Sequence, residues 1–285
     1  MDRDILHIIE TMSGSMSKSQ RRIAEYILAN FDKAAFMTAN RLARLADVSE
    51  STVVRFATEL GYDGYPEMRR ALLDSMRTNL TSVQRIKVAK DRLGSSDILN
   101  QVLLSDIEQI RQTMEETDSS DFTKAVDAIA DAKSIYILGL RSSSFLAKFM
   151  GFYFDLLFSN SRVISETHDS EVFEQIVRLS GDDVLIAISF PRYSRRTIKT
   201  MQYARSIGTK IVAITDSKAS PLNELADISL YARSDMISFL DTLVAPLSLV
   251  NALIVAVSEK APGDLYENFE RLERIWEEYG VYEQI

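Results

Sequence analysis

Five short apolar runs in the second half of the chain constrain its fold more than any other feature of the sequence. They are SIYILGL, RVIS, DVLIAIS, KIVAIT and DISLYA, all between residues 134 and 232. Runs of this length, rich in Ile and Val, are typical of buried strands. The stretches between the first four are long enough for crossover helices, such as FLAKFMGFYFDLLF and TIKTMQYARSIG. This alternation predicts an α/β domain built on a doubly wound, five-stranded parallel sheet.

The first 77 residues follow a helical pattern instead. Ser17 and Ser19 are candidate N-caps for a helix whose apolar residues recur every four positions, at Ile23, Ile27 and Phe31. This stretch therefore predicts an all-α domain in front of the sheet.

Two shorter helices follow, joined by a tight turn at ADVS. Thr38 or Asn40 can cap the first of them, and Ser49 can cap the second. Four apolar residues of the second helix are spaced i, i+3, i+4 and i+7: Val53, Phe56, Ala57 and Leu60. They share one buried face. Ser51, Arg55 and Thr58 must then point outward.

A pair of short helices with this turn predicts a helix-turn-helix, whose second helix enters the major groove of DNA. Arginine can bind guanine O6 and N7 there, and hydroxyls can donate or accept. The predicted DNA contacts are Ser49, Ser51, Thr52, Arg55 and Thr58, with Arg41 and Arg44 on phosphates. Further candidates for phosphate contacts are Arg21, Arg22, Arg69 and Arg70. The alternative is an ordinary helical bundle, because 11 basic and 11 acidic residues leave residues 1–77 without net charge.

The segment NRLARLADVSESTVVRFATELGYDGYPEMRRAL closely resembles the N-terminal domain of the RpiR family of bacterial transcription regulators. In that family a short polar cap, STVVRF and GYDGYPEMR follow one another in this order. Asp47 stands where many helix-turn-helix proteins carry glycine, and Asp tolerates the left-handed conformation better than most residues. We place a DNA-binding domain at residues 1–77 and a polar, partly basic connector at residues 78–95.

Residues 96–285 form the second predicted domain. A long amphipathic helix is predicted in DILNQVLLSDIEQIRQTMEE, and a shorter helix has Phe122, Ala125, Val126 and Ile129 on one face. In doubly wound sheets, ligands bind beyond the carboxyl ends of the strands, at the topological switch point. Two loops are expected there: GLRSSS after the first strand and SFPRYSRRT after the third.

Both loops carry hydroxyl groups at the start of a predicted helix, where backbone N–H groups and the helix dipole favour an anion. The hydroxyls that can donate to phosphoryl oxygens belong to Ser142, Ser143, Ser189, Ser194 and Thr197. Arg192, Arg195 and Arg196 can add charge-assisted bonds if the loop folds inward. Taken singly, each serine is explained as well by helix capping and each arginine by hydration. Two such loops at one sheet edge favour a phosphate site.

The second domain is similar to a SIS (sugar isomerase) domain from about Ala132 to Glu259. The usual phosphate loop of that domain runs Ser-x-Ser-Gly-x-Thr after the third strand, and Ser189, Ser194 and Thr197 hold its hydroxyl positions. Three residues, Pro-Arg-Tyr, are inserted here, and Arg195 takes the place of the glycine. The resemblance implies a sugar-phosphate effector, and a homodimer or homotetramer that acts on genes of sugar metabolism.

An aldose-ketose isomerase is the alternative function for this fold. Glu166, His168 and Glu171 follow the second strand and could supply an acid and a base. The same side chains can instead bind sugar hydroxyls, so we include them among the predicted effector contacts. An isomerase has no evident use for a recognition helix. A nucleotide or dinucleotide binder is a third interpretation, but GLRSSS lacks the glycines of G-x-G-x-x-G.

Composition argues against disulfides and metal sites. The chain has no cysteine, and its two histidines are far apart, so we expect no disulfide, metal or other cofactor. The start MDRDILHIIE is unlike a signal peptide, and no apolar run approaches 18 residues, so we expect a cytoplasmic protein without a membrane partner. The sequence thus predicts a transcription regulator, not an enzyme, that binds double-stranded operator DNA and senses a sugar phosphate.

Overall fold

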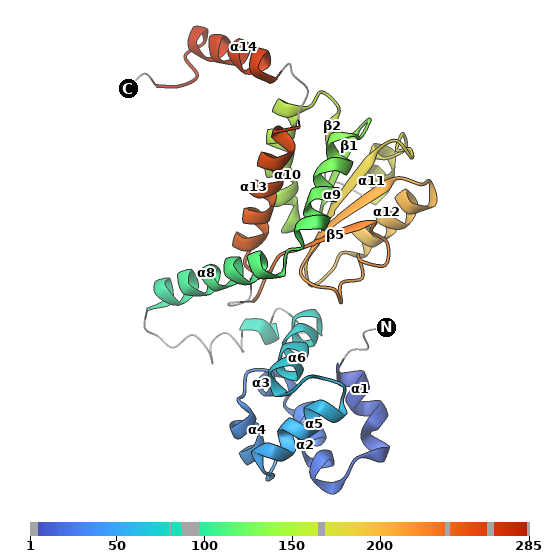
Figure 1. Cartoon of the computed structure of the whole chain (residues 1–285), viewed down its shortest axis with the longest axis vertical. Helices are drawn as coiled ribbons and strands as arrows, with labels where there is room; N and C mark the ends of the chain where they lie inside the picture. The colour runs from blue at the N-terminus through green and yellow to red at the C-terminus, as the bar shows by residue number, and fades with distance from the viewer. Residues whose placement is uncertain are drawn as a thin grey trace. The chain divides into compact units, whose positions relative to one another are not determined.

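The computed structural model of the chain describes residues 5–79, 81, 83–86, 97–164, 169–236, 240–260 and 265–283. The chain forms two compact units (Figure 1). We call Met1–Asn100 together with Met236–Asp241 the helical unit, and Gln101–Asp235 together with Thr242–Ile285 the sheet unit.

The helical unit is a bundle of short helices around one core. Its labelled elements are α1 (Ile5–Met12), the 3-10 turn η1 (Ser13–Ser15), α2 (Lys18–Ala29), α3 (Phe31–Ala34), α4 (Ala39–Leu45), α5 (Glu50–Glu59) and α6 (Tyr65–Asn79). Ile9, Ile27, Leu42, Phe56 and Met68 are fully or almost fully buried, and they come from five different helices. Met236, which follows the last strand of the sheet by a few residues, packs in this same core.

Side-chain caps fix where these helices begin. Ser17 and Gln20 form a reciprocal capping box at the start of α2, as the sequence predicts for Ser17, whereas Ser19 lies within the helix. Thr38 rather than Asn40 caps α4, and Ser49 caps α5. Each cap satisfies a backbone N–H that the helix itself leaves without a partner.

The sheet unit confirms the predicted doubly wound fold. Its strands are β1 (Ile135–Gly139), β2 (Ser161–Ile164), β3 (Val184–Ile188), β4 (Lys210–Thr215) and β5 (Ile228–Tyr231). They form one sheet in the order β2-β1-β3-β4-β5, and every neighbouring pair is parallel. All residues of β1 and β3 are buried, which explains why these strands read as continuous apolar runs.

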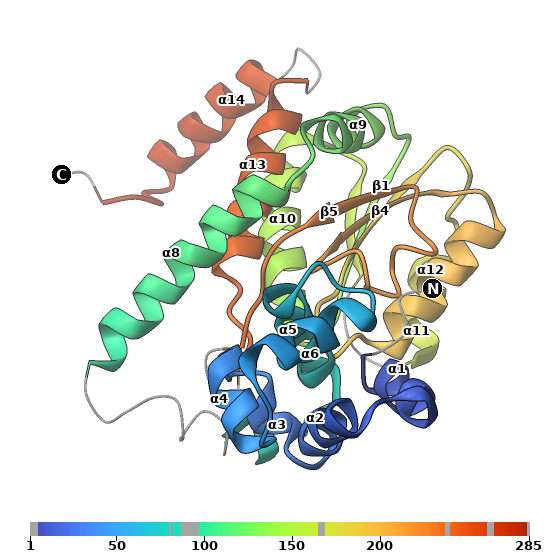
Figure 2. The same ribbon diagram turned by 60° about the horizontal axis from the view of Figure 1, so that its bottom comes forward.

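Helices cover both faces of the sheet (Figure 2). One face packs against α9 (Ser119–Ala130), α10 (Ser143–Leu157) and α13 (Val244–Ser258). The other packs against α11 (Asp169–Gln175) and α12 (Arg195–Ser206). The chain therefore passes to opposite faces after β1 and after β3, and these adjacent strands flank the topological switch point.

Helix α8 (Ile98–Glu116) has the reverse of the usual polarity. Its buried residues are Gln109 and Thr113, while Leu104 and Met114 are 65% and 71% exposed. The Gln109 amide oxygen accepts a hydrogen bond from the backbone N–H of Asp235 at 2.6 Å, and Thr113 Oγ1 accepts one from the N–H of Arg233 at 2.9 Å. Polar bonds thus attach this part of α8 to its own unit. The last helix is α14 (Leu265–Glu278).

Candidate nucleic-acid and anion sites

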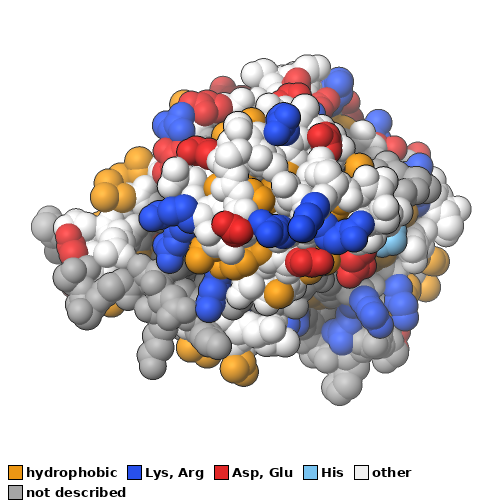
Figure 3. Space-filling view, turned by 90° about the horizontal axis from the view of Figure 1, so that it is seen from below, with side chains coloured by type: hydrophobic (Ala, Val, Ile, Leu, Met, Phe, Trp, Pro, Cys, Tyr) orange, Lys and Arg blue, Asp and Glu red, His pale blue; other side chains and the backbone are white. Residues whose placement is uncertain are grey.

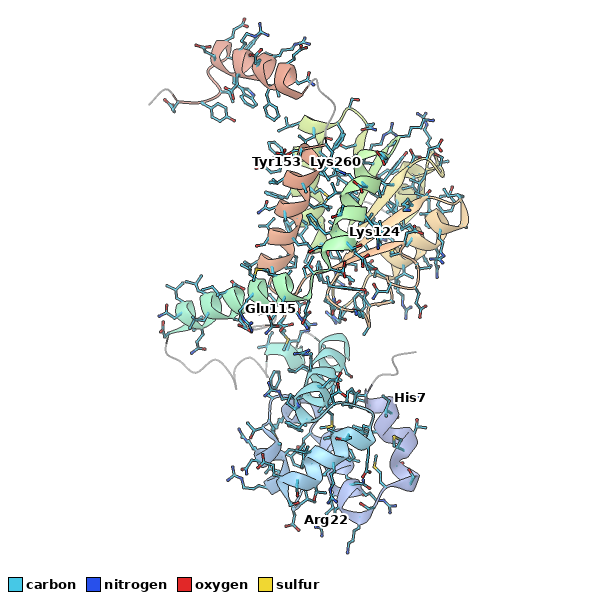
Figure 4. All side chains as sticks on the ribbon, viewed as in Figure 1. His7, Arg22, Glu115, Lys124, Tyr153 and Lys260 are labelled. Carbon is cyan, nitrogen blue, oxygen red and sulfur yellow. The ribbon has the colours of Figure 1, made fainter. Side chains whose placement is uncertain are left out.

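The helical unit contains the predicted helix-turn-helix in α4, the turn and α5. Asp47, in the turn, has a φ of 53°, which is the left-handed conformation expected at this position. Arg22 of α2, labelled in Figure 4, donates through Nη1 to the backbone oxygen of Asp47 at 3.0 Å and to its Oδ2 at 2.9 Å. The turn is therefore anchored from a third helix, a role that the sequence did not show for Arg22.

Helix α5 turns one face to the core and one to solvent. Val53, Phe56 and Ala57 are buried, while Ser51, Arg55 and Thr58 are exposed. Within the described part of the chain, the Arg55 guanidinium makes no hydrogen bond or ion pair. This arrangement leaves Arg55 available to a base edge, although its role in DNA binding stays a prediction.

The hydroxyl groups of α5 are partly engaged within the helix. Ser49 Oγ accepts from the N–H of Thr52 at 3.2 Å, and it lies 2.9 Å from Ser51 Oγ and 2.7 Å from Thr52 Oγ1. Thr58 Oγ1 donates to the Val54 carbonyl at 3.3 Å. Ser49 serves first as the cap that fixes the start of α5.

A groove of about 470 Å³ runs between α5 and the start of α2. It is lined by Ser15, Met16, Ser17, Ser19, Gln20, Thr52, Arg55 and Glu59. The Gln20 amide donates to the Glu59 carboxylate across this groove. The sequence indicates Ser17 and Ser19 only as helix caps, because nothing in the local pattern shows that the start of α2 lies beside Arg55.

Lysine and arginine side chains are exposed on the face of the molecule shown in Figure 3. Among the described side chains of the helical unit, the exposed basic ones are Lys18, Arg21, Arg22, Lys33, Arg41, Arg44, Arg55, Arg69 and Arg70. Acidic side chains are interspersed among the blue ones in the view of Figure 3, in keeping with the balanced charge of the first 77 residues. Arg22 is already bonded to Asp47, so its hydrogen-bonding capacity is partly used.

In the sheet unit, the β1 loop (residues 140–142) and the β3 loop (residues 189–194) leave the same edge. Gly139 pairs with Ile188 in register, so the two strands end level with each other. A Cβ atom on Gly139 would lie 2.4 Å from the Ser143 carbonyl oxygen and 2.8 Å from the Ala147 Cβ. Glycine is therefore required where α10 starts close to the end of β1.

The β3 loop leads into the first turn of α12 through a short series of hydrogen bonds. The N–H of Ser194 donates to Ser189 Oγ, and the N–H of Thr197 donates to Ser194 Oγ, both at 3.4 Å. Ser194 is thus the N-cap of α12. The structure brings together the three hydroxyl residues that the sequence placed in a phosphate loop.

Thr197 stands out among them. Its side chain is 0% exposed, and its Oγ1 has no hydrogen-bond partner among the residues that the structure describes. A buried hydroxyl without a partner costs roughly 1 to 3 kcal/mol, so such a group calls for a physical explanation. A ligand oxygen at the N-terminus of α12 would supply the missing bond.

The β1 loop and the first residue of α10 contribute one exposed and one buried serine. Ser142 is exposed at the N-cap of α10 without a side-chain capping bond, and Ser143 is 4% exposed. Arg141 has a φ of 57°, an unfavourable value for a residue that is not glycine. Strained backbone of this kind is concentrated at functional sites.

The remaining predicted effector contacts are three arginines of residues 192–196 and three polar residues that follow β2. Arg192 and Arg195 are exposed, and Arg196 is half-buried. Glu166 and His168 lie outside the described residues. Glu171 lies on α11, and its side chain is also outside what the structure describes.

A polar contact that the sequence did not indicate lies at the same sheet edge. Tyr193, the last residue of the Pro-Arg-Tyr insertion, donates from its phenol to Asp216 Oδ1 at 2.8 Å. Asp216 directly follows β4 and is 3% exposed. Its position after a buried strand was a signal that the sequence offered, but the partner could not be inferred from spacing.

Two kinds of feature are absent from the described residues. No helix there combines the length and the hydrophobicity needed to cross a membrane. No group of three or more His, Cys, Asp or Glu side chains in that part of the chain could hold a metal ion.

Known proteins resemble both units. Residues 3–79 match the helix-turn-helix domain of the rpiR family, and residues 128–256 match the SIS domain. The HTH-type transcriptional regulator HexR of Escherichia coli K12 is 25% identical, over 96% of this chain and 95% of HexR.

Two solved structures share the fold. The sugar isomerase domain of an RpiR transcription factor from Sphaerobacter thermophilus is 26% identical, with a TM-score of 0.59 over 62% of this chain and 98% of that one. The Vibrio vulnificus NanR protein, solved in complex with ManNAc-6P, is 22% identical, with a TM-score of 0.60 over 98% of this chain and 100% of NanR.

The two matched domains follow each other in the order that the structure shows, a helix-turn-helix bundle and then a five-stranded parallel sheet. Relatives that match along nearly the whole chain are regulators by name. The chain therefore combines a helix-turn-helix domain of the rpiR family with a SIS domain, which is the domain composition of an RpiR-family transcription regulator.

Proposed function

We propose that this regulator binds operator DNA through α5 and that a sugar phosphate, bound between the β1 and β3 loops, alters its DNA affinity. In this proposal residues 1–77 bind DNA, residues 78–95 connect, and residues 96–285 bind the effector. The observation that carries the effector site is the buried Thr197 Oγ1, which has no partner among the described residues.

The phosphate would lie at the N-terminus of α12. Backbone N–H groups and the positive end of the helix dipole favour an anion there, and Thr197 Oγ1 can donate to one of its oxygens. Residues 189–197 contain three arginines and no acid. A phosphate monoester carries about −1.5 to −2 charge at neutral pH, so this local charge favours it over a neutral sugar.

The β1 loop would close the site from the adjacent strand. Ser142 and Ser143 start α10 beside the switch point, where ligands of doubly wound sheets bind. We assign the sugar hydroxyls to Ser142 and, from the segment after β2, to Glu166, His168 and Glu171. The NanR complex supports the choice of a sugar phosphate, since that protein has the same fold.

DNA binding would depend on two kinds of contact. Arg55, with Ser51, Thr52 and Thr58, would contact bases in the major groove, since these side chains lie on or beside the exposed face of α5. Arg41 and Arg44 on α4 would contact phosphates and fix the register of the protein on the duplex.

We also propose that the regulator acts as a homodimer or homotetramer. Leu104 on α8 is 65% exposed, and Phe145 and Phe152 on α10 are 71% and 63% exposed. Apolar side chains exposed in such numbers mark association surfaces. A symmetric dimer would also match an operator with two half-sites. Sedimentation velocity gives the mass, and a monomer at micromolar concentration would contradict this part of the proposal.

A sensor is favoured over an isomerase because the chain has a DNA-binding domain and regulators as relatives. The test is an operator titration with and without a panel of hexose and amino-sugar phosphates, combined with NMR of the same sugars. A sensor shifts the operator affinity and returns the sugar unchanged. Turnover that is abolished by changing Glu166, His168 or Glu171 would favour the isomerase instead.

A further inference from the structure

The Pro-Arg-Tyr insertion lengthens the β3 loop between two residues of the proposed phosphate site. It separates Ser189, at the end of β3, from Ser194, the N-cap of α12. Directly after the loop, Arg195 stands where the Ser-x-Ser-Gly-x-Thr pattern has a glycine. A longer loop can hold its serines in more than one arrangement unless something fixes it.

Tyr193 fixes the end of this insertion. Its ring packs, half-buried, against the core between the sheet and α11 and α12. Its phenol reaches the carboxyl end of β4 and donates to Asp216 Oδ1 at 2.8 Å. The bond therefore ties the β3 loop to the neighbouring strand.

Asp216 is a fixed anchor for this bond. Its side chain is 3% exposed, and two neighbouring hydroxyls also contact the carboxylate: Thr215 Oγ1 at 3.2 Å from Oδ1 and Ser217 Oγ at 3.3 Å from Oδ2. The ion pairs among the described residues do not include it. A buried carboxylate needs hydrogen-bond donors, and Tyr193 is the one that comes from the loop.

Tyr193 is also one residue before the cap of α12. The backbone N–H of Ser194 donates to Ser189 Oγ, and the Ser194 hydroxyl accepts from the N–H of Thr197. Fixing the chain at Tyr193 thus sets the position of Ser194, and through it the directions of Ser189 and the first turn of α12.

We propose that Tyr193 and Asp216 are positioning residues of the effector site, whose hydrogen bond holds the inserted loop in the conformation that binds phosphate. The inference rests on the proposed function, because it concerns the same site. It adds a specific role for two residues outside the Ser-x-Ser-Gly-x-Thr pattern.

The test uses the full-length protein and inorganic phosphate, followed by ³¹P NMR. Tyr193→Phe removes only the phenol oxygen and keeps the ring. We expect it to weaken phosphate binding by about tenfold, the size of effect typical of one lost hydrogen bond that orders a charged site. Tyr203→Phe, on α12, is the matched control, and we expect it to bind phosphate as the wild type does.

A second pair of variants shows whether the effect passes through Asp216. Asp216→Asn keeps an oxygen that can accept the phenol bond, so phosphate affinity should stay within about threefold of wild type. Asp216→Ala removes the acceptor, and adding Tyr193→Phe to it should cause no further loss, because residues that act through one bond are not additive. Circular dichroism shows that each variant is folded.

The outcomes separate this inference from the proposed function. If Thr197→Val weakens phosphate binding but Tyr193→Phe does not, the site stands and the positioning role is wrong. Independent, additive losses in the Tyr193 and Asp216 variants would also overturn the inference. If the wild type binds no phosphate, or if Thr197→Val binds it as well as the wild type does, the proposed effector site fails, and the inference with it.

Discussion

Arg85 Nη1 donates to both carboxylate oxygens of Asp241, at 2.9 and 2.8 Å, although 156 positions separate the two residues. Both belong to the helical unit, and their side chains are only 4% and 20% exposed. The residues Met236 and Asp241, which follow the last strand of the sheet, are therefore part of the bundle that carries the helix-turn-helix.

The first prediction concerns this pair. Removing one partner of a buried ion pair leaves a charge without compensation, which costs about 3 to 5 kcal/mol. We expect Arg85→Met to lower the free energy of unfolding of the helical unit by about this amount, and Arg85→Met combined with Asp241→Leu to recover most of it. Urea unfolding followed by circular dichroism measures both. Equal losses in the single and the double variant would show that the pair is not coupled.

The second prediction concerns the turn at Asp47. Alanine tolerates its φ of 53° less well than aspartate or glycine does. Asp47→Ala should therefore destabilise the bundle by about 1 to 2 kcal/mol relative to Asp47→Gly. Hydrogen exchange of the α4 and α5 amides reports the difference locally. Equal protection in the two variants would mean that the left-handed turn contributes no strain.

Tyr65 gives the third prediction, on alkaline pH. Burial raises the pKa of Tyr65 to about 12 from its ordinary value of 10.0, while the charge of Arg69 opposes the shift. Its Oη also donates to the Met37 carbonyl at 2.8 Å. Because the pKa of Tyr65 is higher in the folded than in the unfolded state, the protonated phenol contributes fully to the free energy of unfolding below pH 10. This contribution is lost as the pH rises towards 12.

The shift in the pKa of Tyr65 corresponds to at most about 3 kcal/mol of the free energy of unfolding. Tyr65→Phe should be less stable near neutral pH, because the bond to Met37 is gone, but it should lose less stability than the wild type between pH 10 and pH 12. Urea midpoints across this range test it. Parallel pH profiles for the two proteins would contradict the assignment.

The fourth prediction separates base contacts from phosphate contacts in DNA. Arg55→Ala should cost about 1 to 3 kcal/mol of specific operator binding and relax the preference at one position of each half-site. Arg41→Ala should weaken binding to all sequences and reduce the salt dependence. Arg178→Ala, an exposed arginine of the sheet unit, is the control. Equal losses for Arg55→Ala on operator and random DNA would exclude a base contact.

Strongly periodic segments predicted their structure well. The apolar runs around Val184 and Ile211 predicted β3 and β4 because a strand buried on both faces has no room for polar residues. The buried face of α5 also followed from spacing, because Val53 and Phe56 repeat with the helical period. Ser194 could be placed at the start of α12 because helix caps use few residue types.

Contacts between distant segments could not be predicted in this way. Arg85 lies in a stretch that looks like a hydrated connector, and nothing near it in the sequence indicates Asp241. The sequence pattern of α8 predicts the wrong buried face. Apolar residues of this helix are exposed, while Gln109 and Thr113 face inward and accept hydrogen bonds from backbone N–H groups. The Tyr193 bond to Asp216 likewise depends on where an inserted loop folds.

In the proposed function, Thr197 and the N-terminus of α12 bind the phosphate of a sugar phosphate. Thr197→Val keeps the buried shape and removes only the hydroxyl, and Thr200→Val, whose hydroxyl bonds to the Arg196 carbonyl, is the matched control.

Isothermal titration calorimetry of the wild type and both variants, with hexose and amino-sugar phosphates and with the same sugars lacking phosphate, tests this most directly. We expect the wild type to bind a phosphorylated sugar but not its parent sugar, Thr197→Val to bind the phosphorylated sugar about tenfold or more weakly, and Thr200→Val to bind it as the wild type does. Equal binding of the sugar with and without phosphate, or a Thr197→Val variant that binds like the wild type, would contradict the proposed function.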